Sequence, residues 1–226
     1  MSDYLDAQQP YSFDYDSTLD IVTDDDQVIG IASSGSLVLQ KPDKIYATRF
    51  RGFANVEMYF DGTALTVYGK NANKYAQIPL AGDTDRLIDE LKNIYQVPMP
   101  AADLLLSNAS VVLLENVSDI KDLGLGVVGG VECDSLAFRT EDVDWQIWIA
   151  KGDKPYPAKY VITSKNIANG PQYSIQTRNW RTAGAVEAHD YTFKNTTNAS
   201  LVELDKVADA YHLPENFTQP EKGAAQ

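Results

Sequence analysis

Residues 131–163 read VECDSLAFR-TED-VDWQIWIA-KGDKP-YPAKYVIT, and this stretch decides the fold class. Three segments rich in large apolar side chains, at residues 131–139, 143–150 and 156–163, are separated by two short polar turns. In the middle segment, one set of alternate positions holds Val143, Trp145, Ile147 and Ile149, and the other holds Asp144, Gln146 and Trp148. A period of two residues is typical of strands in a sheet with one buried face. Because each face carries a tryptophan, we expect one face to be covered and the other to be available for contacts.

The same alternation extends along most of the chain. Residues 11–23 place large apolar or aromatic side chains opposite polar ones, which predicts a long, half-buried strand. Further strands are predicted in the order of a meander at residues 28–40, 44–50, 54–60, 63–68 and 74–80, and then at 111–114, 123–128 and 172–180. Asp61-Gly62 lies between two of these apolar runs and is a strong signal for a two-residue hairpin turn.

One insertion interrupts the strands with a helical period. Asp83 is a suitable N-cap, and the apolar residues that follow share one stripe of a helix that runs to about residue 95. A second short helical piece is predicted over residues 101–107. The sequence therefore predicts a mainly β (α+β) protein. We expect one domain over residues 1–213, with a helical insertion at about 83–107 and a polar, disordered tail over 214–226.

Composition excludes several classes of function. The 226-residue chain has a formal net charge of −13, which opposes binding to nucleic acid, because that affinity rests on cationic contacts with phosphate. Cys133 is the only cysteine and the two histidines are far apart in sequence, so neither a metal site of the usual Cys/His kind nor any cofactor is predicted. The longest apolar run, at residues 123–131, falls far short of the roughly 18 residues that a membrane-spanning helix needs.

Two patterns that resemble active sites favour simpler interpretations. Residues 124–129 (GLGVVG) match a dinucleotide-binding motif, but a strand follows them where that motif requires a helix, so we interpret them as a strand and a hairpin turn. His189 lies in a polar stretch and is expected to be solvent-exposed. A carboxylate pair made by Glu132 or Asp134 with Asp144 leaves an acid hydrolase open as a hypothesis.

Several short motifs resemble an uncharacterised family of predicted periplasmic bacterial proteins. They are residues 42–44 (PDK), 59–62 (YFDG), 101–105 (AADLL), 136–139 (LAFR), 144–149 (DWQIWI) and 159–163 (KYVIT). The resemblance covers roughly residues 1–205, and that family is similar in fold to the lipoprotein carriers LolA and LolB. It implies a strongly curved antiparallel sheet, an open half-barrel whose hollow is closed by a helical lid and holds acyl chains. It also implies export to the periplasm, with the signal and the start of an N-terminal helix removed before Met1.

The leading hypothesis is a non-enzymatic exported protein that binds a hydrophobic ligand, either a lipid or a lipoprotein acyl chain. The expected wall of the hollow consists of Val56, Met58, Phe60, Leu65, Val67, Trp145 and Ile147. The expected lid consists of Leu87, Leu91, Leu104 and Leu105. An alternative is a cell-envelope interaction or sensor module, in which an outward face that includes Trp148 and Tyr59 docks another protein. The acid hydrolase is a third hypothesis.

Overall fold

The computed structural model describes residues 1–97 and 99–207, and one 12-stranded sheet organises them. The strands are β1 (Tyr11–Val22), β2 (Val28–Gln40), β3 (Lys44–Arg51), β4 (Ala54–Phe60), β5 (Ala64–Gly69), β6 (Lys74–Pro79), β7 (Asp119–Val128), β8 (Val131–Arg139), β9 (Val143–Ala150), β10 (Pro157–Ser164), β11 (Gln172–Thr182) and β12 (Ser200–Leu201). The helices are α1 (Ser2–Ala7), α2 (Thr84–Asn93) and α3 (Ala109–Leu114), with the 3₁₀ turns η1 (Ala102–Leu105), η2 (Ala183–Ala185) and η3 (Leu204–Lys206).

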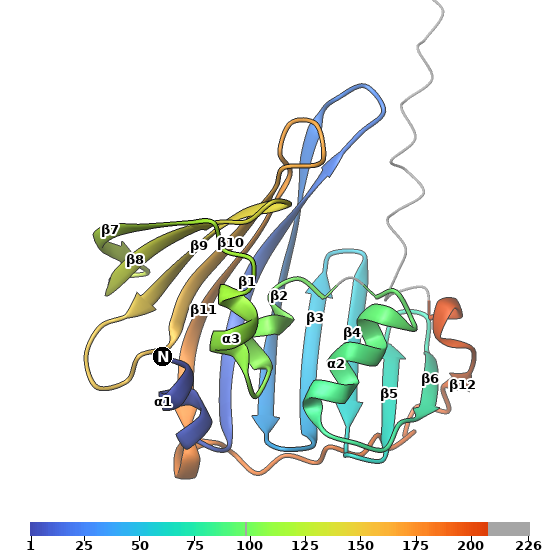
Figure 1. The fold of residues 1–226 in the computed structure, drawn as a ribbon. Coiled ribbons are helices and arrows are strands. Elements are labelled where there is room, and N and C mark those ends of the chain that lie inside the picture. Colours follow the sequence, from blue (N-terminus) through green and yellow to red (C-terminus); the bar gives the residue numbers. More distant parts are fainter. Residues whose placement is uncertain (98, 208–226) are drawn as a thin grey trace, which may run out of the picture.

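The sheet is an open, curved meander in which a long-range pairing joins the two halves in the middle. Its strand order is β12-β6-β5-β4-β3-β2-β1-β11-β10-β9-β8-β7, so β11 returns from the second half to pair with β1 from the first. All neighbours are antiparallel except β12, which runs parallel to β6. Helices α1, α2 and α3 lie against one side of the sheet (Figure 1), which we call the inner face. The predicted mainly β fold, a curved antiparallel sheet with a helical cover, is confirmed.

The stretch that decided the fold class forms strands β8, β9 and β10. The first two have the predicted bounds, and the third is shifted by one residue to Pro157–Ser164. Trp145 lies on the inner face and stacks on Phe138, with ring centroids 3.8 Å apart. Trp148 lies on the opposite, outer face, where Lys159 Nζ is 5.3 Å from the centre of its ring. The alternation therefore assigned the two tryptophans to opposite faces correctly.

One predicted strand is wrong. Residues 111–114 belong to helix α3 (Ala109–Leu114), not to a strand. The β-branched pair Val111-Val112 suggests a strand locally, but α3 packs Leu113 against the Trp145 cluster and leaves Val111 67% exposed. Tertiary contact with one side chain thus overrides a weak local preference for strand. The predicted boundary between residues 213 and 214, and the tail beyond it, lie outside the described residues.

The C-terminal segment, residues 186–199, covers the outer face of β3–β6. It runs from the end of β11 across to β12 at the far edge of the sheet (Figure 1). Phe193 packs on Tyr59, Tyr68 and Tyr75, with centroid distances of 5.6, 5.2 and 5.0 Å. Tyr59, expected on an available face, is therefore covered by the chain itself.

His189 is half-buried rather than solvent-exposed, which corrects the expectation from its polar neighbours. Its ring lies on Tyr46, with centroids 3.9 Å apart, as part of the C-terminal segment. Burial lowers its pKa. In the described part of the chain, no helix is long and apolar enough to cross a membrane.

Candidate functional site

A cavity of about 460 Å³ lies between the inner face of the sheet and the helical segments. Its sheet wall comes mainly from β1, β3, β4 and β11, and its helical wall from α2, from residues 99–101 and from η1. The walls are mostly aliphatic and aromatic. Protein sites for small molecules usually enclose about 300–1,000 Å³ and have such walls, so the cavity has the size and character of a ligand site.

The cavity arises from alternation along long strands. In β1, Tyr11, Phe13, Tyr15, Leu19 and Ile21 line it, whereas the aspartates between them lie on the other face. Asp16, for example, forms an ion pair with Arg178 across the β1–β11 pair. Because successive side chains of a strand point to opposite faces, the same pattern that buries aromatic rings inside keeps the carboxylates of β1 outside.

Helix α2 is a fixed wall of this cavity. Asp83 caps the helix by accepting a hydrogen bond from the Arg86 backbone N–H at 2.9 Å. Thr84 then ties the first turn to the β2–β3 connection, because its backbone N–H and its hydroxyl both donate to the Pro42 carbonyl, at 2.8 and 2.9 Å. The side chains of Leu87 and Leu91 are buried against the sheet. Leu104 and Leu105 of η1 are only half-buried, so η1 is the less firmly packed part of the wall.

Seven of the expected wall and lid residues lie around the cavity. They are Val56, Met58, Val67, Leu87, Leu91, Leu104 and Leu105. Phe60 and Leu65 point to the same face but are fully buried in the core beneath α2. Trp145 and Ile147 also lie on the inner face, in a separate cluster with Phe138 and Tyr160. Alternation along the strands predicted the face of the sheet on which each of these side chains lies. The positions of the helices decide which of them line the cavity.

Sequence reasoning missed the aromatic side chains of the cavity wall. They are Tyr11, Phe13 and Tyr15 of β1, Tyr160 of β10, and Tyr173 and Trp180 of β11. The alternation of β1 was visible in the sequence, but its place at the centre of the sheet, next to β11, was not. Arg49 and Arg51 of β3 were also missed, although they continue the alternate positions occupied by Ile45 and Ala47.

One part of the cavity is polar. The Tyr15 hydroxyl donates to the Thr48 carbonyl at 2.8 Å, crossing β2 at Gly35, where a Cβ would lie 2.0 Å from the same carbonyl oxygen. The Ser17 and Ser33 hydroxyls are hydrogen-bonded at 2.9 Å. Burial raises the pKa of Tyr15 to about 12, so this phenol is uncharged near neutral pH.

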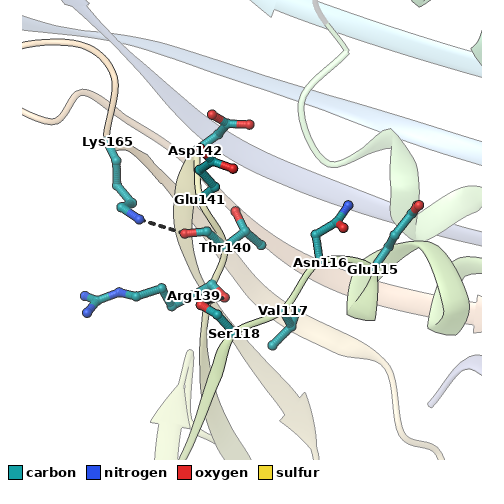
Figure 2. A pocket seen from close by; sticks show the side chains of 9 residues that line it. All are labelled: Glu115, Asn116, Val117, Ser118, Arg139, Thr140, Glu141, Asp142 and Lys165. Atoms are coloured by element: carbon teal, nitrogen blue, oxygen red, sulfur yellow. Dashed lines mark hydrogen bonds between the residues drawn. The ribbon is translucent and has the colours of Figure 1, made fainter.

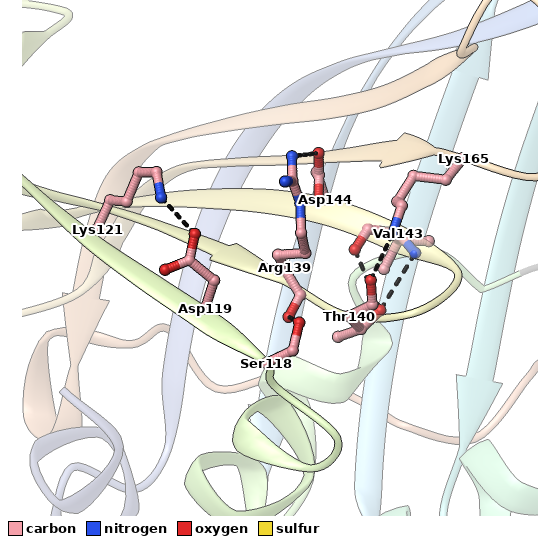
Figure 3. A network of polar contacts seen from close by, with 8 residues as sticks. All are labelled: Ser118, Asp119, Lys121, Arg139, Thr140, Val143, Asp144 and Lys165. Carbon is pink, nitrogen blue, oxygen red and sulfur yellow. Dashed lines mark hydrogen bonds and ion pairs between the residues drawn. The ribbon is translucent and has the colours of Figure 1, made fainter.

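A second hollow of about 780 Å³ lies between the α3–β7 connection, the β8–β9 turn and Lys165 after β10 (Figure 2). Polar and charged side chains and exposed turn backbone form its walls. Its lysine is engaged, because Lys165 Nζ donates to the Thr140 carbonyl at 2.7 Å. Figure 3 shows the adjoining network, in which Arg139 holds both carboxylate oxygens of Asp144 at 2.8 Å. We regard this hollow as an ordinary polar surface between turns, and the apolar cavity as the candidate site.

Two of the carboxylates considered for hydrolysis lie beside cations. The bidentate hydrogen bonds from Arg139 lower the pKa of Asp144, whereas a general acid needs a raised one. Asp134 is exposed and lies 3.5 Å from Lys151 Nζ. Within residues 1–97 and 99–207, no group of three or more His, Cys, Asp or Glu side chains is placed to hold a metal ion.

A comparison with protein families decides what this chain is related to. The model of the family described as "Predicted periplasmic protein (DUF2092)" matches residues 1–205. The chain belongs to this family. The resemblance noted in the sequence, and the periplasmic location that it implied, are thereby confirmed. Among curated proteins, no relative matches.

Three solved structures have some similarity to this chain. An uncharacterized conserved protein from Thermus thermophilus is similar with a TM-score of 0.52 and 10% identity, over 89% of this chain and 95% of that one. LprF from Mycobacterium bovis matches with a TM-score of 0.48 and 11% identity, over 79% and 88%. A LolA superfamily protein from Nitrosomonas europaea matches with a TM-score of 0.38 and 9% identity, over 79% and 90%. At these identities, the Thermus likeness is one of fold alone.

Proposed function

We propose that this DUF2092 protein is a non-enzymatic periplasmic protein that binds a hydrophobic ligand, a lipid or a lipoprotein acyl chain, in its inner cavity. The observation that carries the proposal is the cavity itself: about 460 Å³ of space, walled by apolar side chains from the sheet and from α2 and η1. Burial of apolar surface contributes about 25 cal/mol per Å², so one alkyl chain enclosed by these walls gains useful affinity.

Entry beside η1 fits the packing of the cover. Helix α2 is held by Asp83, by Thr84 and by buried leucines, so it stays in place as a ligand enters. Residues 99–105 line the cavity, Leu104 and Leu105 among them are only half-buried, and Lys92 Nζ forms an ion pair with Asp103. A chain that enters here would slide between Leu104, Leu105 and the aromatic side chains of β1.

The test is direct detection of bound lipid. Native mass spectrometry of protein purified from bacteria should show an added lipid mass, and the delipidated chain should take up a fluorescent fatty acid. Ala47→Trp fills the cavity from β3 and should reduce uptake at least tenfold. Phe50→Trp places the same side chain on the other face of that strand and should leave uptake unchanged. Absence of both copurified lipid and uptake in the wild-type protein would contradict the proposal.

The interaction-module alternative has less support. Its two marker residues are engaged within the chain, Tyr59 under Phe193 and Trp148 beside Lys159. The exposed apolar side chains of the edge strand β7 lie next to an irregularity in its pairing at Asp122–Gly124, and such bulges protect a sheet edge from further pairing. We therefore propose no second function.

A further inference from the structure

The inner cavity holds positive charge in a strongly acidic protein. The chain has 32 acidic and 19 basic residues, yet among the described residues that line the cavity, the only charged side chains are Arg49 and Arg51. If charged residues were distributed at random over the chain, the cavity would contain more carboxylates than basic groups. The strands β1 and β3 give the opposite distribution. Asp14, Asp16 and Asp20 lie on the outer face, and both arginines lie on the inner one.

The two arginines belong to one polar group. They occupy the last two inward positions of β3, and the strand register places them across β2 from Tyr15 and Ser17. Tyr173 of β11 faces them from the other side of β1, near enough for its charge state to be coupled to both arginines. On the apolar side of this group, Ala47 and Met58 pair across β3 and β4 and lead toward the space under α2.

Arg51 is half-buried and meets no carboxylate in the described part of the chain. Its Nε is shielded from solvent and has no hydrogen-bond partner within residues 1–97 and 99–207. Burial, together with the like charge of Arg49, lowers the pKa of the Arg51 guanidinium. Arg139 differs from Arg51 in this respect: it lies at the surface, yet it donates two hydrogen bonds to the Asp144 carboxylate. A buried polar donor without a partner is costly, and the unpaired Nε of Arg51 therefore calls for an explanation.

We propose that the cavity selects amphiphiles with one anionic head group, a carboxylate or a phosphate, which Arg51 and Arg49 bind while the alkyl chain passes Ala47 and Met58 toward α2. This inference rests on the proposed function and specifies the ligand class. Guanidinium groups suit both anions, because their planar array of N–H donors matches pairs of anionic oxygens. The phenol of Tyr15 donates its hydrogen to the Thr48 carbonyl, and burial raises its pKa to about 12, so it does not compete as an anion near neutral pH.

The test compares ligands that share one tail. Isothermal titration calorimetry of the delipidated wild-type protein would use decanoate, monodecyl phosphate, 1-decanol and decyltrimethylammonium. We expect one or both of the anionic ligands to bind at least tenfold more tightly than decanol, since hydrogen bonds to charged groups exceed those to neutral ones by about that factor. The cationic ligand should bind most weakly. The tighter of the two anionic ligands identifies the head group.

Substitutions of single arginines test whether Arg51 causes the preference for anionic ligands. Arg51→Gln should reduce the anionic ligands to the affinity of decanol and leave decanol binding unchanged, whereas Arg51→Lys should retain part of the preference. Arg181→Gln, the same change at an exposed position outside the cavity, should have no effect.

Equal affinity of wild-type protein for decanol and for both anions would overturn the inference and leave the proposed function standing. Failure of all four ligands to bind would overturn both. If Arg51→Gln does not fold, the wild-type ligand series still decides the question.

Discussion

The two halves of the sheet have the same strand pattern but different covers. In the half formed by β3–β6, the inner side chains meet α2, and Leu87 at the centre of that contact is fully buried. In the half formed by β7–β10, Leu113 of α3 and Leu104 of η1 pack against the cluster around Trp145. The outermost strand β7 leaves Leu125 67% exposed. Figure 1 shows this second half turned away from the strands that α2 covers.

The comparison shows that alternation along the strands makes one face of the sheet apolar. Whether that face is then buried depends on the helices that pack against it. The cavity lies along β1 and β11 in the middle of the sheet, and residues of both α2 and η1 line it. Each half has a buried apolar cluster of its own, and open space remains beside them on the inner face. The comparison can be tested by weakening each half in turn.

The largest effect is expected from Trp145→Ala. It removes the ring that stacks on Phe138 and should destabilise the protein by about 3–5 kcal/mol, the usual cost of truncating a buried aromatic side chain. Urea unfolding followed by circular dichroism measures it, with Phe50→Ala, an exposed aromatic position, as the control. An effect no larger than that of the control would mean that the second half has no core of its own.

Leu87→Ala should destabilise the first half by about 2–5 kcal/mol, because it leaves a cavity beneath a helix that the sheet holds in place. Leu125→Ala, the same substitution on the exposed edge strand, should change stability by no more than about 0.5 kcal/mol. Urea unfolding of the pair tests the contrast between covered and uncovered halves. Similar losses for both variants would show that β7 is covered in solution.

Gly35→Ala tests the central strands between the two halves. The added Cβ would collide with the Thr48 carbonyl and with the Tyr15 hydroxyl, so we expect a loss of about 1–3 kcal/mol and displacement of Tyr15. Gly52 has no atom near its Cβ position, and Gly52→Ala should therefore be nearly neutral. Thermal unfolding and the Tyr15 ring resonances in NMR spectra would report the two outcomes. A neutral Gly35→Ala would refute the close approach.

The smallest effect concerns the ion pair at the end of β8 and β9. The hydrogen bonds from Arg139 hold the pKa of Asp144 below its ordinary value near 3.9, so the pair's stabilisation is present above that value and is lost as pH falls through the lowered folded-state pKa. Arg139→Gln should raise the pKa of Asp144 toward the ordinary value in an NMR titration. An unchanged titration midpoint would show that the pair does not persist in solution.

Local patterns predicted most elements because they depend on few contacts. The strands β2, β4, β8 and β9 have the predicted bounds, and the N-cap at Asp83 is correct. Helix α3 was missed, because in its six residues Val111-Val112 carries a strand preference that only the contact of Leu113 with the Trp145 cluster outweighs. Of the expected ligand-contacting residues, Phe60 lies in a closed core although its neighbour Met58 lines the cavity.

The sequence by itself determined the period of each strand, the single helical insertion and, through resemblance, the family. These are properties of neighbouring residues, since a strand places alternate side chains on opposite faces wherever it lies. Only the tertiary structure decided which inward residues remain beside open space and which are packed closed. It also decided that Arg49 and Arg51 share a cavity with Tyr15 and Tyr173. That outcome depends on the pairing of β1 with β11, two strands separated by most of the chain.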